Sequence, residues 1–183
     1  MSTAMMMMSP IMMTGFAPTP KPTVTSFKYL GDLAPVGYFD PLNLNSGPKV
    51  SEERLKYWRE AELQHGRTAM FGALALPLLE LNNPEMLSIN YLSNMDQMMQ
   101  SPFWGAMLVY EGCRLLAGYE NPFGKDGKAF TLKKDYQPGN LLNINPDNVS
   151  TERYNRELSN GRLAMLACAH IIGSELATGQ GLF

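Results

Sequence analysis

The chain has 183 residues, a length that fits one domain, and its formal net charge of -2 offers no basic surface for a nucleic acid. Hydrophobic residues make up 45% of the chain, yet the mean hydropathy is only -0.18, which is typical of neither a soluble nor a membrane protein. The average hides a pattern, because the apolar residues fall into three blocks separated by long polar loops.

Residues 1–30 are predicted to form an extended N-terminal segment. The first twenty residues contain no charged side chain and seven of the chain's methionines. They lack the basic start of a secretory signal and the Arg-rich composition of a transit peptide. Prolines up to Pro22 favour a loop over a helix. We therefore expect one folded domain over residues 31–183.

The first apolar block predicts a helix over residues 51–81. Ser51 has the character of an N-cap, and Glu52 and Glu53 place negative charge in the first turn. About 28 residues of helix extend roughly 42 Å, which exceeds a hydrocarbon core of about 30 Å. A helix of this length is expected to cross a membrane at a tilt.

Two further helices are predicted, over residues 101–119 and 150–178. In the second helix Ser101 and Pro102 have the character of an N-cap and a first helical residue, and Gly118 lies near the end. Roughly seventeen residues is the lower limit for spanning a bilayer. The chain is therefore expected to be an all-α membrane protein with three transmembrane helices and long loops between them.

An internal repeat links the first predicted helix to the third. Residues 59–70, REAELQHGRTAM, and residues 154–165, YNRELSNGRLAM, share six identities at an offset of 95 positions. In the same register Glu80 matches Glu175, and the middle helix has no counterpart. We therefore predict that the first and third helices form a crossed pair related by a pseudo-two-fold axis.

Each copy of the repeat carries a carboxylate and a guanidinium group inside an apolar helix, where an unpaired charge is costly. Glu62 and Arg67 lie about 140° apart around a helix axis and cannot pair comfortably with each other. Pairing across the two helices removes this problem, because Glu62 can meet Arg162 while Glu157 meets Arg67. The sequence therefore predicts two reciprocal ion pairs.

The same helix faces combine ligand groups with small residues. Glu62 and His65 share a face whose other residues are small, which leaves room beside the backbone for something flat and large. Glu157 and Asn160 hold the matching positions in the third helix. A carboxylate that already meets an Arg retains a spare oxygen for a metal ion, and imidazole and amide groups are neutral ligands. In the middle helix the arginine that compensates Glu111 lies three residues further on.

These motifs resemble those of the chlorophyll-binding light-harvesting complex family. The resemblance rests on ExxHGRxAM in the first helix, ExxNGRxAM in the third, ExxR in the second and FDPLNL at residues 39–44. It covers about residues 30–180. The third-helix motif and the short loops are most similar to the red-lineage, fucoxanthin-chlorophyll-protein-like antennae. The resemblance therefore implies chlorophyll a, chlorophyll c and xanthophyll carotenoids as cofactors.

The resemblance also implies roles for individual residues. Axial ligation of chlorophyll magnesium is implied for Glu62, His65, Glu111, Glu157 and Asn160. Charge compensation of these ligands is implied for Arg67, Arg114 and Arg162. Contacts with the ends of carotenoids are implied for Phe39, Asp40 and Asn140. The family usually has Gln at position 174, and Ser174 would hold a pigment only through water.

An antenna subunit, not an enzyme, is the function that the resemblance implies. Such a protein is a multi-pass protein of the plastid thylakoid membrane, in contact with a photosystem core, neighbouring antenna subunits and thylakoid lipids. A photoprotective quencher of the same family is an alternative. A more distant alternative is a di-iron carboxylate enzyme, although that chemistry requires ExxH on two helices and the second copy here is ExxN.

Overall fold

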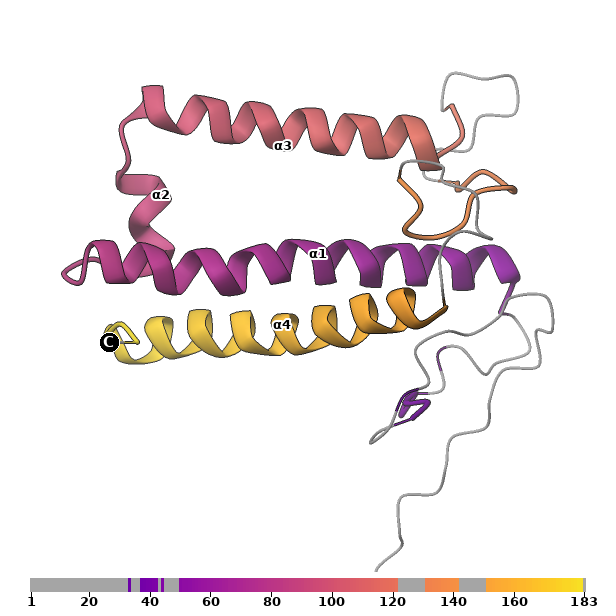
Figure 1. The fold of residues 1–183 in the computed structure, drawn as a ribbon, viewed down its shortest axis with the longest axis horizontal. Helices are drawn as coiled ribbons and strands as arrows, with labels where there is room; N and C mark the ends of the chain where they lie inside the picture. The colour runs from indigo at the N-terminus through magenta and orange to yellow at the C-terminus, as the bar shows by residue number, and fades with distance from the viewer. Residues whose placement is uncertain are drawn as a thin grey trace, which may run out of the picture.

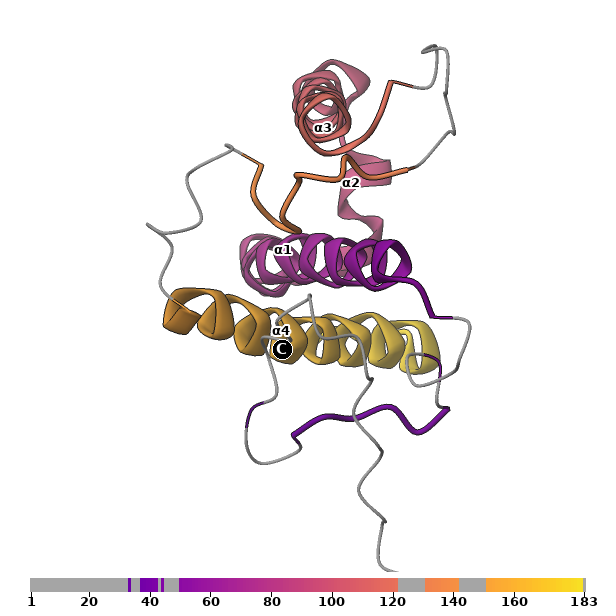
Figure 2. The ribbon, with the colours of Figure 1, turned by 90° about the vertical axis from the view of Figure 1, so that its right-hand side faces the viewer.

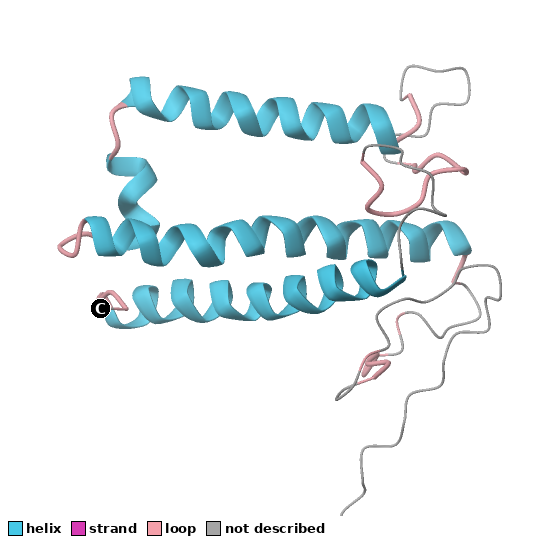
Figure 3. Ribbon diagram, in the orientation of Figure 1, coloured by secondary structure: helices cyan, strands magenta, loops and turns pink. Residues whose placement is uncertain are grey.

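The computed structural model describes residues 33, 37–42, 44, 50–121, 131–141 and 151–182. Its elements follow in the order α1, η1, α2, α3 and α4, and Tyr119 and Leu132 form an isolated antiparallel bridge. Because no strand occurs among the described residues, the predicted all-α class is confirmed (Figures 1 and 3). The segment predicted over residues 1–30 lies outside this part of the chain.

The first long helix, α1 (Glu52–Asn82), begins directly after the predicted N-cap. The Ser51 hydroxyl accepts a hydrogen bond from the Arg54 amide at 3.3 Å, which satisfies one of the free N–H groups of the first turn. After α1 the chain turns through the short helices η1 (Ser88–Asn90) and α2 (Tyr91–Asn94). The turn brings the chain to the side of α1 on which α3 lies (Figure 1).

The second long helix, α3 (Gln97–Gly118), begins four residues earlier than predicted. The predicted N-cap at Ser101 is wrong, because Asp96 holds that position and both Ser101 and Pro102 lie inside the helix. Pro102 is the sixth residue of α3, so its missing N–H removes only one helix hydrogen bond near the start. The Ser101 hydroxyl donates to the Gln97 carbonyl oxygen at 2.9 Å instead of capping.

The third long helix, α4 (Thr151–Thr178), lies beside α1 and runs in the same direction. α3 runs in the opposite direction on the other side of α1 (Figures 1 and 2). Figure 2 shows that α1 and α4 cross, with their N-terminal ends on opposite sides of the crossing. The two copies of the repeat are therefore paired as predicted.

Two glycines allow the close approach of α1 and α4. A Cβ atom added to Gly66 would lie 3.1 Å from Gly161 Cα, and one added to Gly161 would lie 3.0 Å from Gly66 Cα. Small residues at a helix crossing let the two backbones come into contact. Because these glycines hold equivalent positions of the repeat, each helix meets the other at the same point of its own sequence.

The buried interior of the helix pair follows the repeat as well. Leu63 and Leu158 are equivalent in the repeat, and each is 2% exposed. Glu80 and Glu175 are also equivalent, and each is 1% exposed near the C-terminal end of its helix. The pair is thus built on leucines and glycines near the crossing and on buried carboxyl groups at one end.

Within the described residues, none of the helices has both the length and the hydropathy of a membrane span. The outer helix surfaces nevertheless carry large apolar side chains. Leu108 and Leu116 on α3 are 75% and 80% exposed, and Leu74 and Leu166 on the crossed pair are 70% and 71% exposed. Extended apolar surfaces of this kind mark places that other apolar material covers.

Candidate functional site

The charged residues of the repeat meet across the crossed helices. Arg67 Nε lies 2.6 Å from Glu157 Oε1, and Arg162 Nε lies 2.7 Å from Glu62 Oε1. Both bonds join α1 to α4, so the predicted exchange of partners is confirmed. Each carboxylate keeps unused oxygen lone pairs, and each can accept a further ligand without adding net charge to the helix pair.

The two ion pairs are not equivalent. Arg59 Nη1 lies 2.7 Å from the second oxygen of Glu62, Oε2, whereas the position of α4 equivalent to Arg59 is Tyr154. Within the described residues, Glu62 therefore meets two guanidinium groups and Glu157 meets only that of Arg67. Arg59 was not among the predicted site residues, although its spacing of three residues from Glu62 is the spacing of a helical ion pair.

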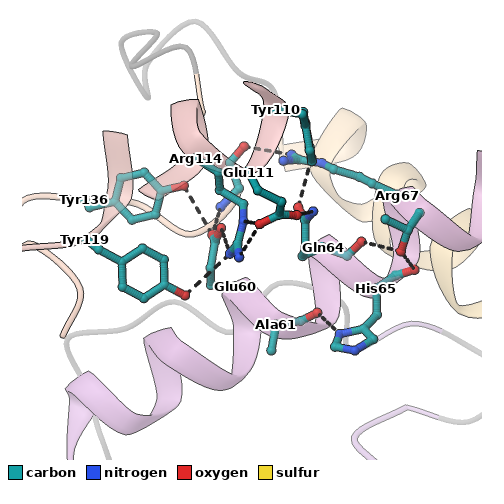
Figure 4. A network of polar contacts seen from close by, with 12 residues as sticks. Glu60, Ala61, Gln64, His65, Arg67, Tyr110, Glu111, Arg114, Tyr119 and Tyr136 are labelled. Carbon is teal, nitrogen blue, oxygen red and sulfur yellow. Dashed lines mark hydrogen bonds and ion pairs between the residues drawn. The ribbon is translucent and has the colours of Figure 1, made fainter. Parts of the chain in front are cut away.

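His65 lies on the exposed outer surface of α1, and one nitrogen of its ring contacts a backbone carbonyl group. Nδ1 lies 2.7 Å from the carbonyl oxygen of Ala61, one turn earlier (Figure 4). Because a carbonyl oxygen only accepts hydrogen bonds, this contact places the hydrogen of a neutral ring on Nδ1. Nε2 then keeps its lone pair and is free to bind a metal ion.

Asn160 is the residue of α4 that is equivalent to His65. Its side chain is exposed, and it forms no hydrogen bond within the described part of the chain. Its amide oxygen is therefore available as a neutral ligand atom. α1 and α4 each present one neutral ligand group together with one paired carboxylate.

On α3 the carboxylate of Glu111 is held from two sides. Arg114 Nη2 and Nε lie 2.8 Å and 2.9 Å from Glu111 Oε2, so the predicted pairing within this helix is confirmed. Gln64 Nε2 on α1 donates to Glu111 Oε1 at 3.0 Å, and the Tyr110 hydroxyl donates to Gln64 Oε1 at 2.9 Å (Figure 4). Gln64 and Tyr110 were not among the predicted site residues, because no repeat relates α1 to α3.

Glu60 joins α1 to the loop 131–141 and to α3. The side chain is 2% exposed, and its Oε2 accepts hydrogen bonds from the Gly139 amide at 2.7 Å and the Tyr136 hydroxyl at 3.3 Å. Arg114 Nη1 lies 3.7 Å from Glu60 Oε1 (Figure 4). Burial raises the pKa of the Tyr136 phenol, and the nearby Glu60 carboxylate adds to the rise. Glu60 was not among the predicted site residues, because the only sign of it in the sequence is a second acidic residue within REAEL.

The residues expected at carotenoid ends lie in loops. Asp40 is 5% exposed, and its two oxygens accept hydrogen bonds from the Leu44 amide at 3.0 Å and the Tyr38 hydroxyl at 3.3 Å. Asp40 therefore shapes the turn in which it lies. Phe39 beside it is 61% exposed, and Asn140 is half-buried in the other loop. Their contact with carotenoids stays a prediction.

Ser174 lies apart from the polar cluster around the helix crossing. It is fourteen residues beyond Asn160, or roughly 21 Å along the helix. Its hydroxyl donates to the Ile171 carbonyl oxygen at 2.9 Å, which leaves the oxygen lone pairs as acceptors. Water-mediated binding of a pigment by Ser174 stays a prediction.

The buried carboxyl groups of Glu80 and Glu175 have reciprocal surroundings. Glu175 accepts hydrogen bonds from the Ser88 hydroxyl and from the Ile89 amide, the latter at 3.2 Å. Glu80 packs against Gly181, where an added Cβ atom would lie 1.7 Å from Glu80 Oε1. Each carboxyl group thus contacts the segment that follows the other helix, a relation that the repeat alone did not show.

The candidate ligand groups of this site do not cluster around one point. The described residues contain no group of three or more His, Cys, Asp or Glu side chains that could hold a metal ion. A bare cation needs several protein ligands. Magnesium already held by the four nitrogens of a tetrapyrrole needs only one axial atom, and the free Nε2 of His65 and the free amide oxygen of Asn160 fit that need. The described part of the site therefore presents single ligand atoms on a helical scaffold, an arrangement that suits axial ligation of a tetrapyrrole metal.

Comparison with known proteins supports this interpretation. The profile of the chlorophyll A-B binding protein family matches residues 27–176. The chain is 32% identical to light-harvesting complex stress-related protein 1 of Chlamydomonas reinhardtii over 91% of this chain and 72% of that protein. It is also 32% identical to the fucoxanthin-chlorophyll a-c binding protein of Isochrysis galbana over 79% of this chain and 74% of that protein. The chain belongs to the chlorophyll a-b binding protein family.

The relatives come from several branches of this family. Chlorophyll a-b binding protein 4 of Arabidopsis thaliana is 31% identical over 88% of this chain and 69% of that protein. The chain spans 62% of the stress-related proteins 3.1 and 3.2 of Chlamydomonas reinhardtii. These relatives are named as light-harvesting or chlorophyll-binding proteins of the chloroplast, so the resemblance seen in the sequence is confirmed.

Proposed function

We propose that this chain is a light-harvesting antenna subunit that binds chlorophylls and carotenoids and passes excitation energy to a photosystem. The observation that carries this proposal is the reciprocal pairing of Glu62 with Arg162 and of Glu157 with Arg67. Neutralised in this way, both carboxylates keep lone pairs for axial ligation. Bound chlorophyll supplies the absorption of light and its transfer as excitation. The chain supplies fixed positions and orientations for the pigments.

Each proposed role falls on a group with suitable chemistry. Axial ligands to chlorophyll magnesium are the carboxylates of Glu62, Glu111 and Glu157, the imidazole of His65 and the amide of Asn160. Charge is compensated by Arg67, Arg114 and Arg162. Contacts with carotenoid ends come from Phe39, Asp40 and Asn140, and Ser174 binds a pigment through water.

We place the protein in the plastid thylakoid membrane as a multi-pass protein. In this proposal α1, α3 and α4 are the three membrane helices of one pigment-binding domain over residues 31–183, with residues 1–30 as an extended segment. Family membership and the exposed apolar helix surfaces support this placement. Reciprocal pairing of the charges lowers the cost of placing them in a bilayer. The partners are a photosystem core, neighbouring antenna subunits and thylakoid lipids.

The proposed pigments are chlorophyll a, chlorophyll c and xanthophylls. Fucoxanthin-chlorophyll a-c binding proteins among the relatives support this set. Extraction and chromatography of pigments from the purified native complex test it directly. We expect chlorophylls a and c together with a xanthophyll. A colourless preparation would contradict the antenna function, whereas chlorophyll b in place of chlorophyll c would contradict only the pigment set.

His65→Leu is expected to remove one chlorophyll while the remaining pigments still assemble. Leucine has no lone pair for magnesium, and His65 lies on the exposed surface, so helix packing is spared. Pigment number per chain after reconstitution measures the effect. His170→Leu, a matched change at the other histidine, which is exposed on α4, should keep every pigment. Equal pigment numbers in His65→Leu and wild type would refute the ligand role.

A photoprotective quencher is the second candidate, and the light-harvesting complex stress-related proteins among the relatives favour it. A quencher would dissipate excitation in the same pigment scaffold instead of passing it on. The fluorescence lifetime of the isolated complex at neutral and acidic pH separates the two functions. A dedicated quencher has a short lifetime in one of these conditions, and an antenna has a long lifetime in both.

The di-iron enzyme has no such support. His65, the histidine of the ExxH motif, faces the open surface of α1. A di-iron centre instead needs carboxylates and histidines that point into one bundle interior. The relatives named above carry no enzyme name.

A further inference from the structure

Gln64 forms a buried polar bridge between α1 and α3. The side chain is 9% exposed, and both ends of its amide are hydrogen-bonded to α3. Nε2 donates to Glu111 Oε1 at 3.0 Å, while Oε1 accepts from the Tyr110 hydroxyl at 2.9 Å (Figure 4). The bridge therefore connects the helix that carries His65 to the helix that carries Glu111.

The orientation of this amide follows from the chemistry of its partners. An ionised carboxylate only accepts hydrogen bonds, so the NH2 group of Gln64 must face Glu111. The carbonyl oxygen then faces Tyr110, whose hydroxyl is the donor. A flipped amide would set two acceptors against each other at Glu111, so only one orientation satisfies all three residues.

The bridge also fixes the Glu111 carboxylate. Arg114 holds Oε2 at 2.8 Å and Gln64 holds Oε1 at 3.0 Å, so each oxygen is bound by a donor from a different helix. The terminal torsion of a Glu side chain is broad when it is unrestrained. With both oxygens held, the remaining lone pairs point in defined directions. Hydrogen bonds to a ligand carboxylate also tune how strongly it donates to a metal.

We infer that Gln64 is a positioning residue for the chlorophyll bound by α3, acting through its hydrogen bond to the Glu111 carboxylate. The inference rests on the proposed role of Glu111 as a magnesium ligand. Gln64 sets the direction and donor strength of that ligand. Because Gln64 directly precedes His65, it also fixes the α3 pigment relative to the pigment on α1. Gln64 itself contacts no magnesium.

The test reconstitutes the full chain with pigments in four forms. Glu111→Leu identifies the absorption band of the pigment on α3 by removing it. Gln64→Met keeps the side-chain length and removes both hydrogen bonds. Gln100→Met is the matched control, since Gln100 donates to the Met95 carbonyl oxygen at 2.7 Å at the other end of α3. The readouts are pigment number per chain and the absorption difference spectrum.

We expect Gln64→Met to keep the pigment number of wild type and to shift the one band that Glu111→Leu removes. Gln100→Met should give a flat difference spectrum. A Gln64→Met spectrum superimposable on wild type overturns the inference while leaving Glu111 as a ligand. If Glu111→Leu loses no chlorophyll, the proposed ligand role falls and the inference falls with it.

Tyr110→Phe provides a second variant in case Gln64→Met does not assemble. It removes only the bond that holds the carbonyl end of the amide, which frees the amide to rotate. A smaller shift at the Glu111 band supports the inference. An unchanged spectrum, or a shift confined to the band lost in His65→Leu, overturns it.

Discussion

Arg67→Leu is expected to prevent assembly of the pigmented complex. Within the described residues, Arg67 is the only guanidinium partner of Glu157, and its Nη2 also donates to the Gly139 carbonyl oxygen at 2.7 Å. Breaking one side of a buried ion pair costs roughly 3–5 kcal/mol. The two side chains are 26% and 31% exposed, which favours the lower end of that range. The yield of reconstituted complex should therefore fall roughly 100-fold.

Substitutions of two other arginines should lower the yield of assembled complex less than Arg67→Leu does. Arg162→Leu should cost less, because Glu62 keeps its contact with Arg59 at 2.7 Å. Arg156→Leu is the matched control, since its pair with Glu152 has both side chains 72% exposed and is worth only about 0.5 kcal/mol. Equal yields for all three variants would show that the crossed ion pairs do not hold the helices together.

Gly66→Leu is expected to separate the crossed helices. The Cβ atom alone would lie 3.1 Å from Gly161 Cα, and backbone atoms on the facing helix cannot move aside as a side chain does. Overpacking of a tight contact costs roughly 1–3 kcal/mol, and the rest of the leucine adds to it. The helices must move apart, and pigments that depend on both helices should be lost. Pigment number and chlorophyll circular dichroism measure the change.

Gly173→Leu on α4 is the control for this substitution. A Cβ atom at Gly173 would meet nothing within 4 Å, so leucine there fits without moving the helix. Complexes with this change should keep their pigments and their spectra. Assembly of Gly66→Leu at the wild-type level would contradict a packing role for the glycine contact.

The crossed pair could be predicted from the sequence because each copy of the repeat carries two opposite charges that cannot pair within their own helix. A carboxylate and an arginine about 140° apart on one helix must find partners elsewhere, and the twin helix offers both. The ion pair of Glu111 and Arg114 could also be predicted from the sequence, because it depends only on a spacing of three residues on one helix. These contacts follow from local geometry and symmetry.

Contacts between α1 and α3 could not be predicted in the same way. The bridge from Gln64 to Glu111 depends on how far apart these helices lie and how they are rotated, and no repeat relates them. Glu60 was missed because both of its hydrogen-bond donors belong to the loop 131–141, whose path has no helical period. The start of α3 was placed at Ser101 because Ser-Pro is a strong local signal, yet Asp96 precedes the helix.

The Arg67→Leu/Glu157→Leu double variant tests most directly whether the paired carboxylates are pigment ligands. Removing both charges strands neither, so assembly should recover relative to Arg67→Leu alone. One ligand is then missing, and we predict a complex with one chlorophyll fewer per chain than wild type. A double variant that assembles with its full complement of chlorophyll would contradict the account.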